Sequence, residues 1–227
     1  MLDVSRKELK YIVGVKEMYY LRERLDKIMS QDKNNGDIGY RVRSLYFDTF
    51  WDNDYYDKLD GVDNRQKVRM RIYNDSDSVI KLELKAKEGD FQRKRSLTLN
   101  RNEADRLIEG DYFFMLERPE PFAHGLFTFM TTRGYRPKCI VEYDRFAFIH
   151  DINETRITFD SRLRALESPT DFFNPDAFLY PVLDPAQTTM EVKYNGFLFS
   201  HIKKIINLAD RPRVSNSKYI WSRNFLR

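Results

Sequence analysis

Five segments of this sequence alternate apolar residues with polar ones, and most of the charged residues at the polar positions are basic. They are Gln66–Tyr73, Lys81–Lys87, Phe91–Asn100, Thr155–Arg164 and Met190–Tyr194. Arginine binds a phosphate group through two parallel hydrogen bonds, and lysine binds it as a compact point charge. Rows of such side chains can therefore bind a ligand that carries several phosphate groups.

A few carboxylates interrupt these basic rows, at Glu83, Asp160 and Glu191. Mg²⁺ and Mn²⁺ prefer oxygen ligands and often bind one or two carboxylates together with the phosphate oxygens of a substrate. The three carboxylates are therefore candidate ligands for such a metal. Glu83 lies between Lys81 and Lys85, which favours a charge-balancing role for it over metal binding.

The positions between the charged residues are mostly apolar, so each segment predicts a strand with an apolar face and a charged face. In an ordinary antiparallel sheet the polar face is solvated, and this interpretation suits any one of the strands. Five such strands in succession favour another interpretation, because neighbouring cations repel unless an anion lies between them. A sheet curled into a barrel with its charged face inside would form a basic tunnel for an anionic ligand.

Helices are predicted where apolar residues recur every three or four positions. The expected ranges are Lys16–Ser30, Asn102–Glu109 with Asn102 as its cap, Pro121–Thr132, Phe199–Asn207 and Ser215–Phe225. The polar stretch Gln31–Gly39 and the proline-rich stretch Glu167–Pro185 are expected to be loops within one domain.

The composition is typical of a folded chain. Its 227 residues are 41% hydrophobic and 15% aromatic, and neither a repeat nor a long linker divides them, so a single domain over residues 1–227 is expected. The lone Cys139 excludes an intrachain disulfide and a cysteine-rich metal site. The sequence also lacks the glycine-rich motif of P-loop nucleotide-binding proteins.

Cytoplasmic localisation is the expectation from the sequence. Met1–Val13 lacks the apolar core of a signal peptide, and no run reaches the ~18 apolar residues of a membrane span. The net charge of +4 is mild, so the composition does not point to nucleic acid as a partner.

Eight short motifs occur in the same order as in a known family. They are Glu8–Tyr11, Ser44–Asp48, Lys67–Arg71, Leu82–Lys85, Glu142–Arg145, Arg156–Asp160, Glu191–Lys193 and Ser217–Tyr219. Together they resemble the VTC-type polyphosphate polymerase domain, a member of the triphosphate tunnel superfamily that also contains the CYTH proteins. Each motif alone is weakly specific, but their order covers almost the whole chain.

The resemblance implies an α+β fold, namely an antiparallel β-barrel of about eight strands with flanking helices around a triphosphate tunnel. It implies ATP and polyphosphate as ligands, and Mn²⁺ or Mg²⁺ as cofactor. It implies transfer of the terminal phosphate of ATP to a polyphosphate chain.

Site residues follow from the resemblance position by position. Glu191 matches the metal-binding acid. The residues matched to catalysis are Arg69, Arg71, Arg145, Lys193 and Lys218. The residues matched to substrate phosphate binding are Lys10, Lys85, Lys94, Arg156 and Ser217. An alternative for Arg145 is a structural ion pair with Asp144 or Asp160.

The sequence departs from the family patterns in two ways. CYTH triphosphatases begin with Glu-x-Glu-x-Lys, but here Arg6 precedes Glu8 and Lys10, which argues against their two-metal hydrolysis. Eukaryotic polymerases carry a phosphate-sensing helical domain and membrane helices, neither of which occurs in these residues. A separately encoded membrane-protein partner is therefore expected to supply such functions.

Three function classes remain open at this point. The first is a polyphosphate polymerase. The second is a tunnel hydrolase that acts on triphosphate, nucleoside triphosphate or polyphosphate. The third is a module that binds a phosphate chain without catalysis.

Overall fold

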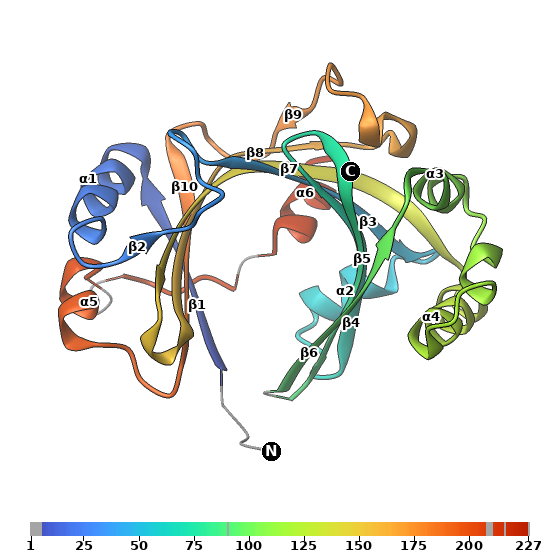
Figure 1. Cartoon of the computed structure of the whole chain (residues 1–227), viewed down its shortest axis with the longest axis horizontal. Coiled ribbons are helices and arrows are strands. Elements are labelled where there is room, and N and C mark those ends of the chain that lie inside the picture. Colours follow the sequence, from blue (N-terminus) through green and yellow to red (C-terminus); the bar gives the residue numbers. More distant parts are fainter. Residues whose placement is uncertain (1–5, 90, 208–210, 216, 227) are drawn as a thin grey trace. The chain divides into compact units, whose positions relative to one another are not determined.

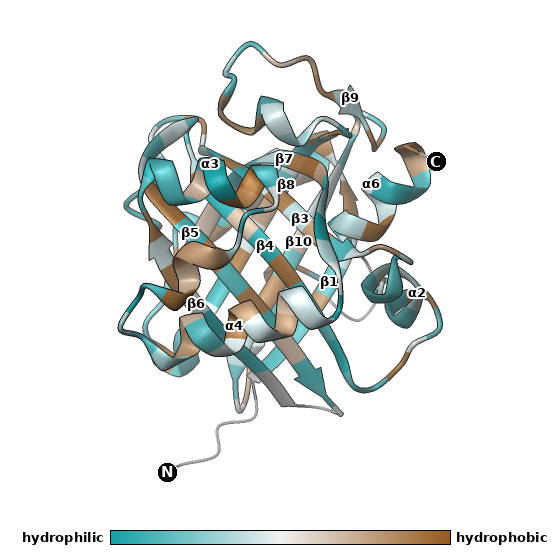
Figure 2. Ribbon diagram, turned by 90° about the vertical axis from the view of Figure 1, so that its right-hand side faces the viewer, coloured by the Kyte–Doolittle hydropathy of each residue, from teal (hydrophilic) through white to brown (hydrophobic). Residues whose placement is uncertain are grey.

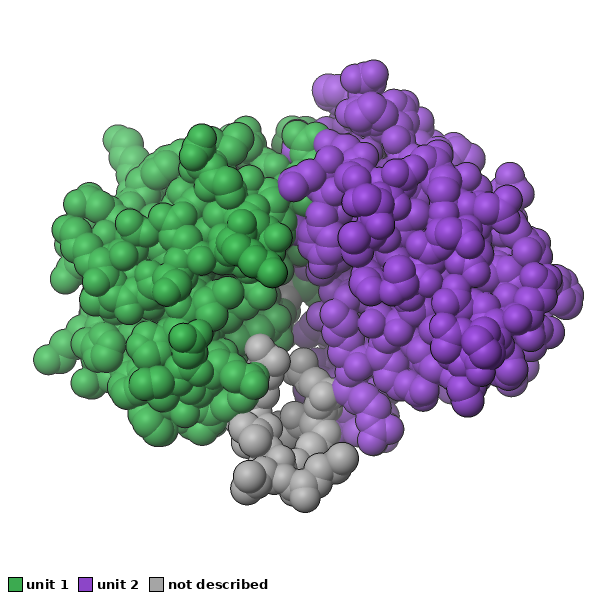
Figure 3. All heavy atoms as spheres, in the orientation of Figure 1, with its two compact units in different colours: residues 1–41, 143–163, 181–217 green, residues 42–142, 164–180, 218–227 purple. Residues whose placement is uncertain are grey.

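The computed structural model describes residues 6–89, 91–207, 211–215 and 217–226. The chain divides into two compact units, which Figure 3 shows in different colours. Unit 1 comprises residues 1–41, 143–163 and 181–217, and unit 2 comprises residues 42–142, 164–180 and 218–227.

The described strands form one antiparallel sheet, labelled in Figure 1. They are β1 (Arg6–Gly14), β2 (Ser30–Gln31), β3 (Tyr40–Thr49), β4 (Arg65–Tyr73), β5 (Ser76–Glu88), β6 (Phe91–Leu99), β7 (Tyr135–His150), β8 (Thr155–Leu166), β9 (Tyr180–Pro181) and β10 (Gln187–Asn195). The order is β1-β10-β8-β7-β3-β4-β5-β6, with β2 paired to β7 and β9 to β8. The predicted α+β class with an antiparallel sheet is confirmed. Hydrogen bonding among the described residues follows an open path with β1 and β6 as end strands.

Helices flank the strands of each unit. They are α1 (Val15–Leu25), α2 (Asn53–Leu59), α3 (Arg101–Glu109), α4 (Pro121–Thr132), α5 (Ser200–Ile205) and α6 (Lys218–Leu226), with short 3-10 helices η1 (Phe113–Leu116), η2 (Ile152–Glu154) and η3 (Pro169–Phe173). In unit 1, α1 packs on β1, β10 and α5. In unit 2, α3 packs on β5, and α4 packs on β6 and η1.

Each unit has its own hydrophobic core, built from the apolar face of its strands. In unit 2, Val68, Met70 and Ile72 of β4 are fully buried with residues of β5, α3 and α4. In unit 1, Ile157 of β8 and Val192 of β10 are buried with residues of β1, α1 and α5. Figure 2 shows hydrophobic and hydrophilic residues alternating along the strands of unit 2. The alternation in the sequence therefore places the charged residues on the opposite face of both strand groups.

The helix predictions agree with the structure to different degrees. The range of α4 is as predicted, whereas α1 ends at Leu25 because the chain then turns so that Ser30 can pair with Ile149 in the sheet. The cap of α3 is Asn100 rather than Asn102, since its side chain accepts a hydrogen bond from the Glu103 amide while Glu103 accepts one from the Asn100 amide. Helix α2 was not predicted. No described helix is long and apolar enough to cross a membrane.

Candidate functional site

The charged face of unit 2 is a grid formed by three neighbouring strands, β4, β5 and β6. The register places in successive rows Arg71, Lys81 and Thr98; Arg69, Glu83 and Ser96; and Lys67, Lys85 and Lys94. Six bases thus surround one carboxylate and two hydroxyl groups. We call this set the unit 2 basic face.

Glu83 is the centre of the unit 2 basic face. Its carboxylate accepts hydrogen bonds from Arg69 at 2.7 Å and pairs with Lys94, and it is only 1% exposed. Burial alone would raise the pKa of Glu83, but the charges of Arg69 and Arg71 and the hydrogen bond from Lys94 hold it well below its ordinary value. Glu83 therefore stays ionised and balances the bases, as predicted from its sequence neighbours.

Aromatic and hydroxyl groups of β3 and α6 support the arginines of the unit 2 basic face. Arg71 donates to Ser44 Oγ at 3.0 Å, and Arg69 donates to the Tyr46 hydroxyl at 3.2 Å. The Tyr46 ring stacks on Tyr219 with centroids 4.9 Å apart. These contacts hold both guanidinium groups in place. Both residues are also largely buried, since Arg69 is 9% exposed and Arg71 is 6% exposed.

The charged face of unit 1 is a second grid, formed by β1, β10 and β8. Its rows are Glu8, Lys193 and Arg156; Lys10, Glu191 and Thr158; and Ile12, Thr189 and Asp160. Arg145 of β7 joins the grid through Asp160. We call this set the unit 1 mixed face, because acids and bases alternate across it.

Arg145 and Asp160 form a bidentate ion pair on the unit 1 mixed face. Arg145 Nε and Nη2 donate to the two Asp160 oxygens at 2.7 Å and 2.8 Å. Burial alone would lower the pKa of Arg145, but the charge of Asp160 raises it well above its ordinary value. Of the two partners considered from the sequence, Asp160 is therefore the observed one; Asp144 instead pairs with Arg162 at 2.6 Å.

Arg156 is held by one residue that precedes β3 and by the first residue of β3. Its Nη2 donates to Asp32 at 2.6 Å and to the Tyr40 hydroxyl at 3.0 Å. Asp32 lies in the stretch interpreted as a polar loop, and it is 6% exposed. A segment that looked like a simple connection thus positions one of the predicted phosphate-binding residues.

Glu191 lies beside Lys10 and Lys193, the two lysines of this face that were predicted to contact phosphate. It pairs directly with Lys193, which also approaches Glu8 at 3.5 Å, and Lys10 pairs with Glu8 at 2.7 Å. Burial and the neighbouring Glu191 would raise the pKa of Glu8, but Lys10 and Lys193 lower it. The four groups form one alternating network of charges.

A small cavity opens on the unit 1 mixed face. Its volume is about 120 Å³, and it is lined by Arg145, Arg156, Thr158, Glu191 and Lys193. A water molecule occupies about 30 Å³ in the liquid, so the cavity has room for about four waters or for a group such as one phosphate. Four of the predicted site residues therefore meet around a space of suitable size.

The two faces differ in charge. On the unit 1 mixed face each base has a carboxylate partner. The pairs are Lys10 with Glu8, Arg145 with Asp160, Arg156 with Asp32, and Lys193 with both Glu8 and Glu191. The sequence led us to expect that an external anion would have to balance the bases. On this face carboxylates of the chain itself do so, whereas the unit 2 basic face contains one carboxylate for its six bases.

The donor set around Glu191 fits a hard divalent cation. No group of three or more His, Cys, Asp or Glu side chains suited to a metal occurs among the described residues. Glu191 and Glu8 nevertheless lie on adjacent strands and share Lys193. One or two carboxylates completed by substrate phosphates and waters are a common environment for Mg²⁺. Glu83 and Asp160 are held by arginine ion pairs, whereas Glu191 pairs with a lysine, which makes Glu191 the better candidate.

The remaining predicted residues lie as follows. Lys85 is half-buried between Lys67 and Lys94 on the unit 2 basic face. Ser217 ends the last segment of unit 1, and Lys218 begins α6 in unit 2. The predicted phosphate contacts of Ser217 and Lys218 stay predictions.

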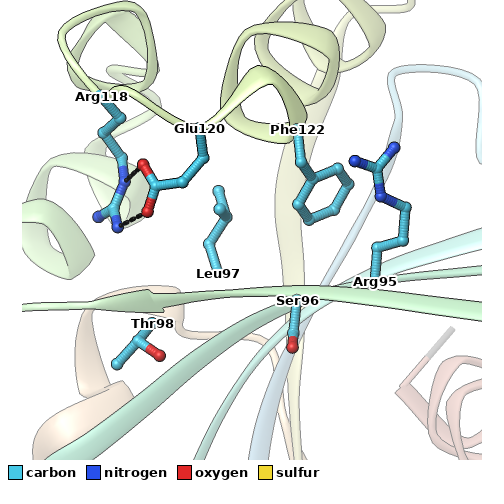
Figure 4. A pocket seen from close by; sticks show the side chains of 7 residues that line it. All are labelled: Arg95, Ser96, Leu97, Thr98, Arg118, Glu120 and Phe122. Carbon is cyan, nitrogen blue, oxygen red and sulfur yellow. Dashed lines mark hydrogen bonds and ion pairs between the residues drawn. The ribbon is translucent and has the colours of Figure 1, made fainter.

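A larger cavity in unit 2 contains none of the predicted residues. It measures about 440 Å³ and is lined by Arg95, Ser96, Leu97, Thr98, Arg118, Glu120 and Phe122 (Figure 4). Arg118 donates to Glu120 and Glu103 at 2.8 Å, and the Arg95 guanidinium lies 4.1 Å from the centre of the Phe122 ring. Arg118 is thus paired with two carboxylates, and Arg95 is the other base in this lining.

Sequence reasoning missed several residues that shape the unit 1 mixed face. Asp32 and Tyr40 are far from Arg156 in the sequence, and no local pattern connects them. Glu8 belongs to the first of the eight motifs, Glu8–Tyr11, which did not point to a role for it. Thr158 shares the charged parity of β8, and that signal could have identified it.

Solved structures with a similar fold come from proteins of low sequence identity. An adenylate cyclase candidate from Bacillus halodurans has a TM-score of 0.51 and 13% identity, covering 89% of this chain and 88% of that one. An adenylyl cyclase candidate from Hippeastrum with a dominant triphosphatase activity has a TM-score of 0.58 and 13% identity, covering 96% and 95%. An adenylate cyclase candidate from Vibrio parahaemolyticus has a TM-score of 0.50 and 14% identity, covering 96% and 97%. At these identities the likeness shows the fold.

The family comparison covers nearly all of the sequence. No curated protein matches the chain. The model of the VTC domain matches residues 5–227. The order of motifs, the charged faces of the strands and this match agree, and the chain belongs to the VTC domain family.

Proposed function

We propose that this chain is a phosphotransferase that moves the γ-phosphate of ATP onto a polyphosphate chain. The observation that carries the proposal is the cavity of about 120 Å³ on the unit 1 mixed face, where three bases and Glu191 meet in a VTC domain. The lining itself holds three bases and one carboxylate, whereas Asp160 and Asp32, the partners of Arg145 and Arg156, are not part of it. Such a lining suits a phosphate group with a divalent cation better than it suits an uncharged ligand.

The unit 2 basic face is suited to hold a phosphate chain. Phosphate groups repeat along such a chain. The six bases also repeat, because they occur at every second residue along a strand and on adjacent strands, so they provide a series of partners. Arg69 and Arg71 are fixed by Glu83, Tyr46 and Ser44, so little side-chain entropy is lost when they bind a phosphate.

The proposed reaction needs no nucleophilic side chain. A terminal oxygen of the polyphosphate attacks the γ-phosphorus of ATP, the new P–O bond forms, and the bond from the γ-phosphorus to the β,γ-bridging oxygen breaks to release ADP. Catalysis of such a transfer depends on positioning and on neutralising negative charge. Arg145, Arg156 and Lys193 supply that charge around the cavity.

A divalent cation fits this reaction. Glu191 would hold Mg²⁺ or Mn²⁺, with Glu8 on the adjacent strand within reach of the same lysine. When bound, the metal would neutralise charge on the phosphate groups. Lys193, which pairs with Glu191 and approaches Glu8, would contact a phosphate oxygen beside that site.

The test is the variant Glu191→Gln, which keeps the size of the side chain but removes its charge. The purified wild type and variant are incubated with ATP, Mn²⁺ and a short polyphosphate primer, and binding of polyphosphate is measured separately. Loss of turnover with retained polyphosphate binding supports the proposal. Equal turnover in both proteins contradicts the role of Glu191, and polyphosphate binding without turnover in the wild type would reduce the function to binding.

A tunnel triphosphatase is the second candidate. The observation that favours it is the pair of carboxylates, Glu8 and Glu191, on adjacent strands around Lys193. The similar Hippeastrum protein has a dominant triphosphatase activity. The same incubation separates the two candidates, because a hydrolase releases free phosphate whether or not a primer is present.

A further inference from the structure

Two polar atoms in the lining of the unit 1 cavity have no hydrogen-bond partner among the described residues. They are Thr158 Oγ1 and Arg156 Nε, and both are buried. A third such atom, Thr189 Oγ1, lies in the neighbouring row of the same face. Buried polar groups are nearly always hydrogen-bonded, because an unsatisfied buried donor or acceptor destabilises the folded state.

Thr158 occupies a central position in this face. The register places it directly opposite Glu191, and Arg156 and Asp160 flank it on the same face of β8. Its side chain is 4% exposed. A hydroxyl group can donate to a phosphate oxygen, and the Nε–H of Arg156 can donate to another oxygen of the same group.

We propose that Thr158 is a phosphate-binding residue that donates its hydroxyl proton to a phosphate oxygen in the cavity, beside the Nε–H of Arg156. This inference rests on the proposed function, since it assigns a further ligand contact to the same site. Asp160 orients the side chain of Arg145, and Glu8 lies near that of Lys193. The Thr158 hydroxyl adds a neutral hydrogen-bond donor to these charged groups.

A structural role for Thr158 is the competing explanation, because threonine favours strands whatever it contacts. The chain contains a matched control for this alternative. Thr188 Oγ1 of β10 is also buried without a described partner, but Thr188 shares the parity of Met190 and Val192 in the core. Thr188→Val therefore removes a buried hydroxyl group away from the cavity.

The experiment measures binding of inorganic tripolyphosphate by calorimetry at several KCl concentrations, together with the unfolding temperature. Replacing a hydrogen bond to a charged group by an isosteric methyl group should weaken binding about tenfold in Thr158→Val. Thr158→Ser should stay within about twofold of the wild type, and so should Thr188→Val. Because the hydroxyl is neutral, the salt dependence of binding should be the same in Thr158→Val and the wild type.

Each outcome has a distinct meaning. If Thr158→Val binds tripolyphosphate as the wild type does, the inference is wrong while the proposed function stands. If Thr158→Val and Thr188→Val lose binding and stability equally, the effect is structural and the inference is also wrong. If the wild type itself fails to bind tripolyphosphate, the proposed function fails with it.

Discussion

Replacing Glu83 by glutamine should make the protein less stable when free and tighter in binding when a phosphate chain is present. Glu83 is buried and pairs with Arg69 at 2.7 Å. Removing one partner of a buried ion pair typically costs about 3–5 kcal/mol, because the other charge stays buried. For a protein of this size, a loss of about 3 kcal/mol lowers the unfolding temperature by about 6–12 °C.

The gain in binding follows from the same charge. A phosphate held by the bases of the unit 2 basic face would lie about one to two strand spacings from Glu83, or about 7 Å. At an effective dielectric constant of about 20, removal of that repulsion is worth about 2 kcal/mol per unit charge before screening by salt. Glu83→Gln should therefore bind tripolyphosphate about tenfold more tightly at low ionic strength.

The assay compares thermal unfolding with and without saturating tripolyphosphate, and calorimetry gives the affinity. Glu88→Gln is the matched control, because Glu88 lies exposed at the end of the same strand. The low pKa of Glu83 adds a check on sign: its contribution to stability is present above its ordinary pKa and is lost as pH falls toward the lower folded value. If the variant is as stable as the wild type, or is stabilised less by tripolyphosphate, Glu83 does not have the proposed effects on stability and binding.

Two further predictions concern stability. Burial and the nearby Asp48 raise the pKa of Asp54 to about 8, and Tyr135 donates to its carboxyl group at 2.8 Å. The folded state thus holds a proton that the unfolded state releases, so the free energy of unfolding should fall as pH rises from about 4 to 8, by up to ~1.4 kcal/mol per pH unit. Urea titrations should show that this dependence on pH is flatter in Asp54→Asn. An equal slope in both proteins would contradict the prediction. Gly39 has φ +102°, and a Cβ there would lie 2.5 Å from the Arg145 carbonyl oxygen. Gly39→Ala should lower the free energy of unfolding by more than about 2 kcal/mol. Gly36 also has a positive φ but open space around it, so Gly36→Ala should lower it by about 1 kcal/mol. Equal losses in both variants would show that the close approach to Arg145 is unimportant.

Local patterns predicted much of the fold. The alternation in Gln66–Tyr73 identified β4 and assigned Arg69 and Arg71 to one face, because a strand turns successive side chains to opposite sides. The predicted range of α4 agrees with the structure, where Pro121 occupies the first turn of the helix. Helix α2 was missed because it has only seven residues and its N-cap, Asp52, has a left-handed backbone conformation.

The partners of the site residues were harder to predict. Arg156 pairs with Asp32 across 124 positions, and no local rule connects a base in a strand with an acid in a polar turn. The sequence showed an excess of cations on one face, but only the register showed that Glu8, Asp160 and Glu191 neutralise the bases of unit 1. Strand pairing between distant segments is set by the whole fold, so the sequence alone could identify the charged faces and not their balance.

The central claim is that this VTC domain transfers the γ-phosphate of ATP to a phosphate chain. The most direct measurement incubates the purified protein with ATP radiolabelled on its γ-phosphate, Mn²⁺ and a short polyphosphate primer, and separates the products on a gel. We expect the label to enter a ladder of lengthening polyphosphate and ADP to accumulate. Label released only as free phosphate, or label that stays on ATP, would contradict it.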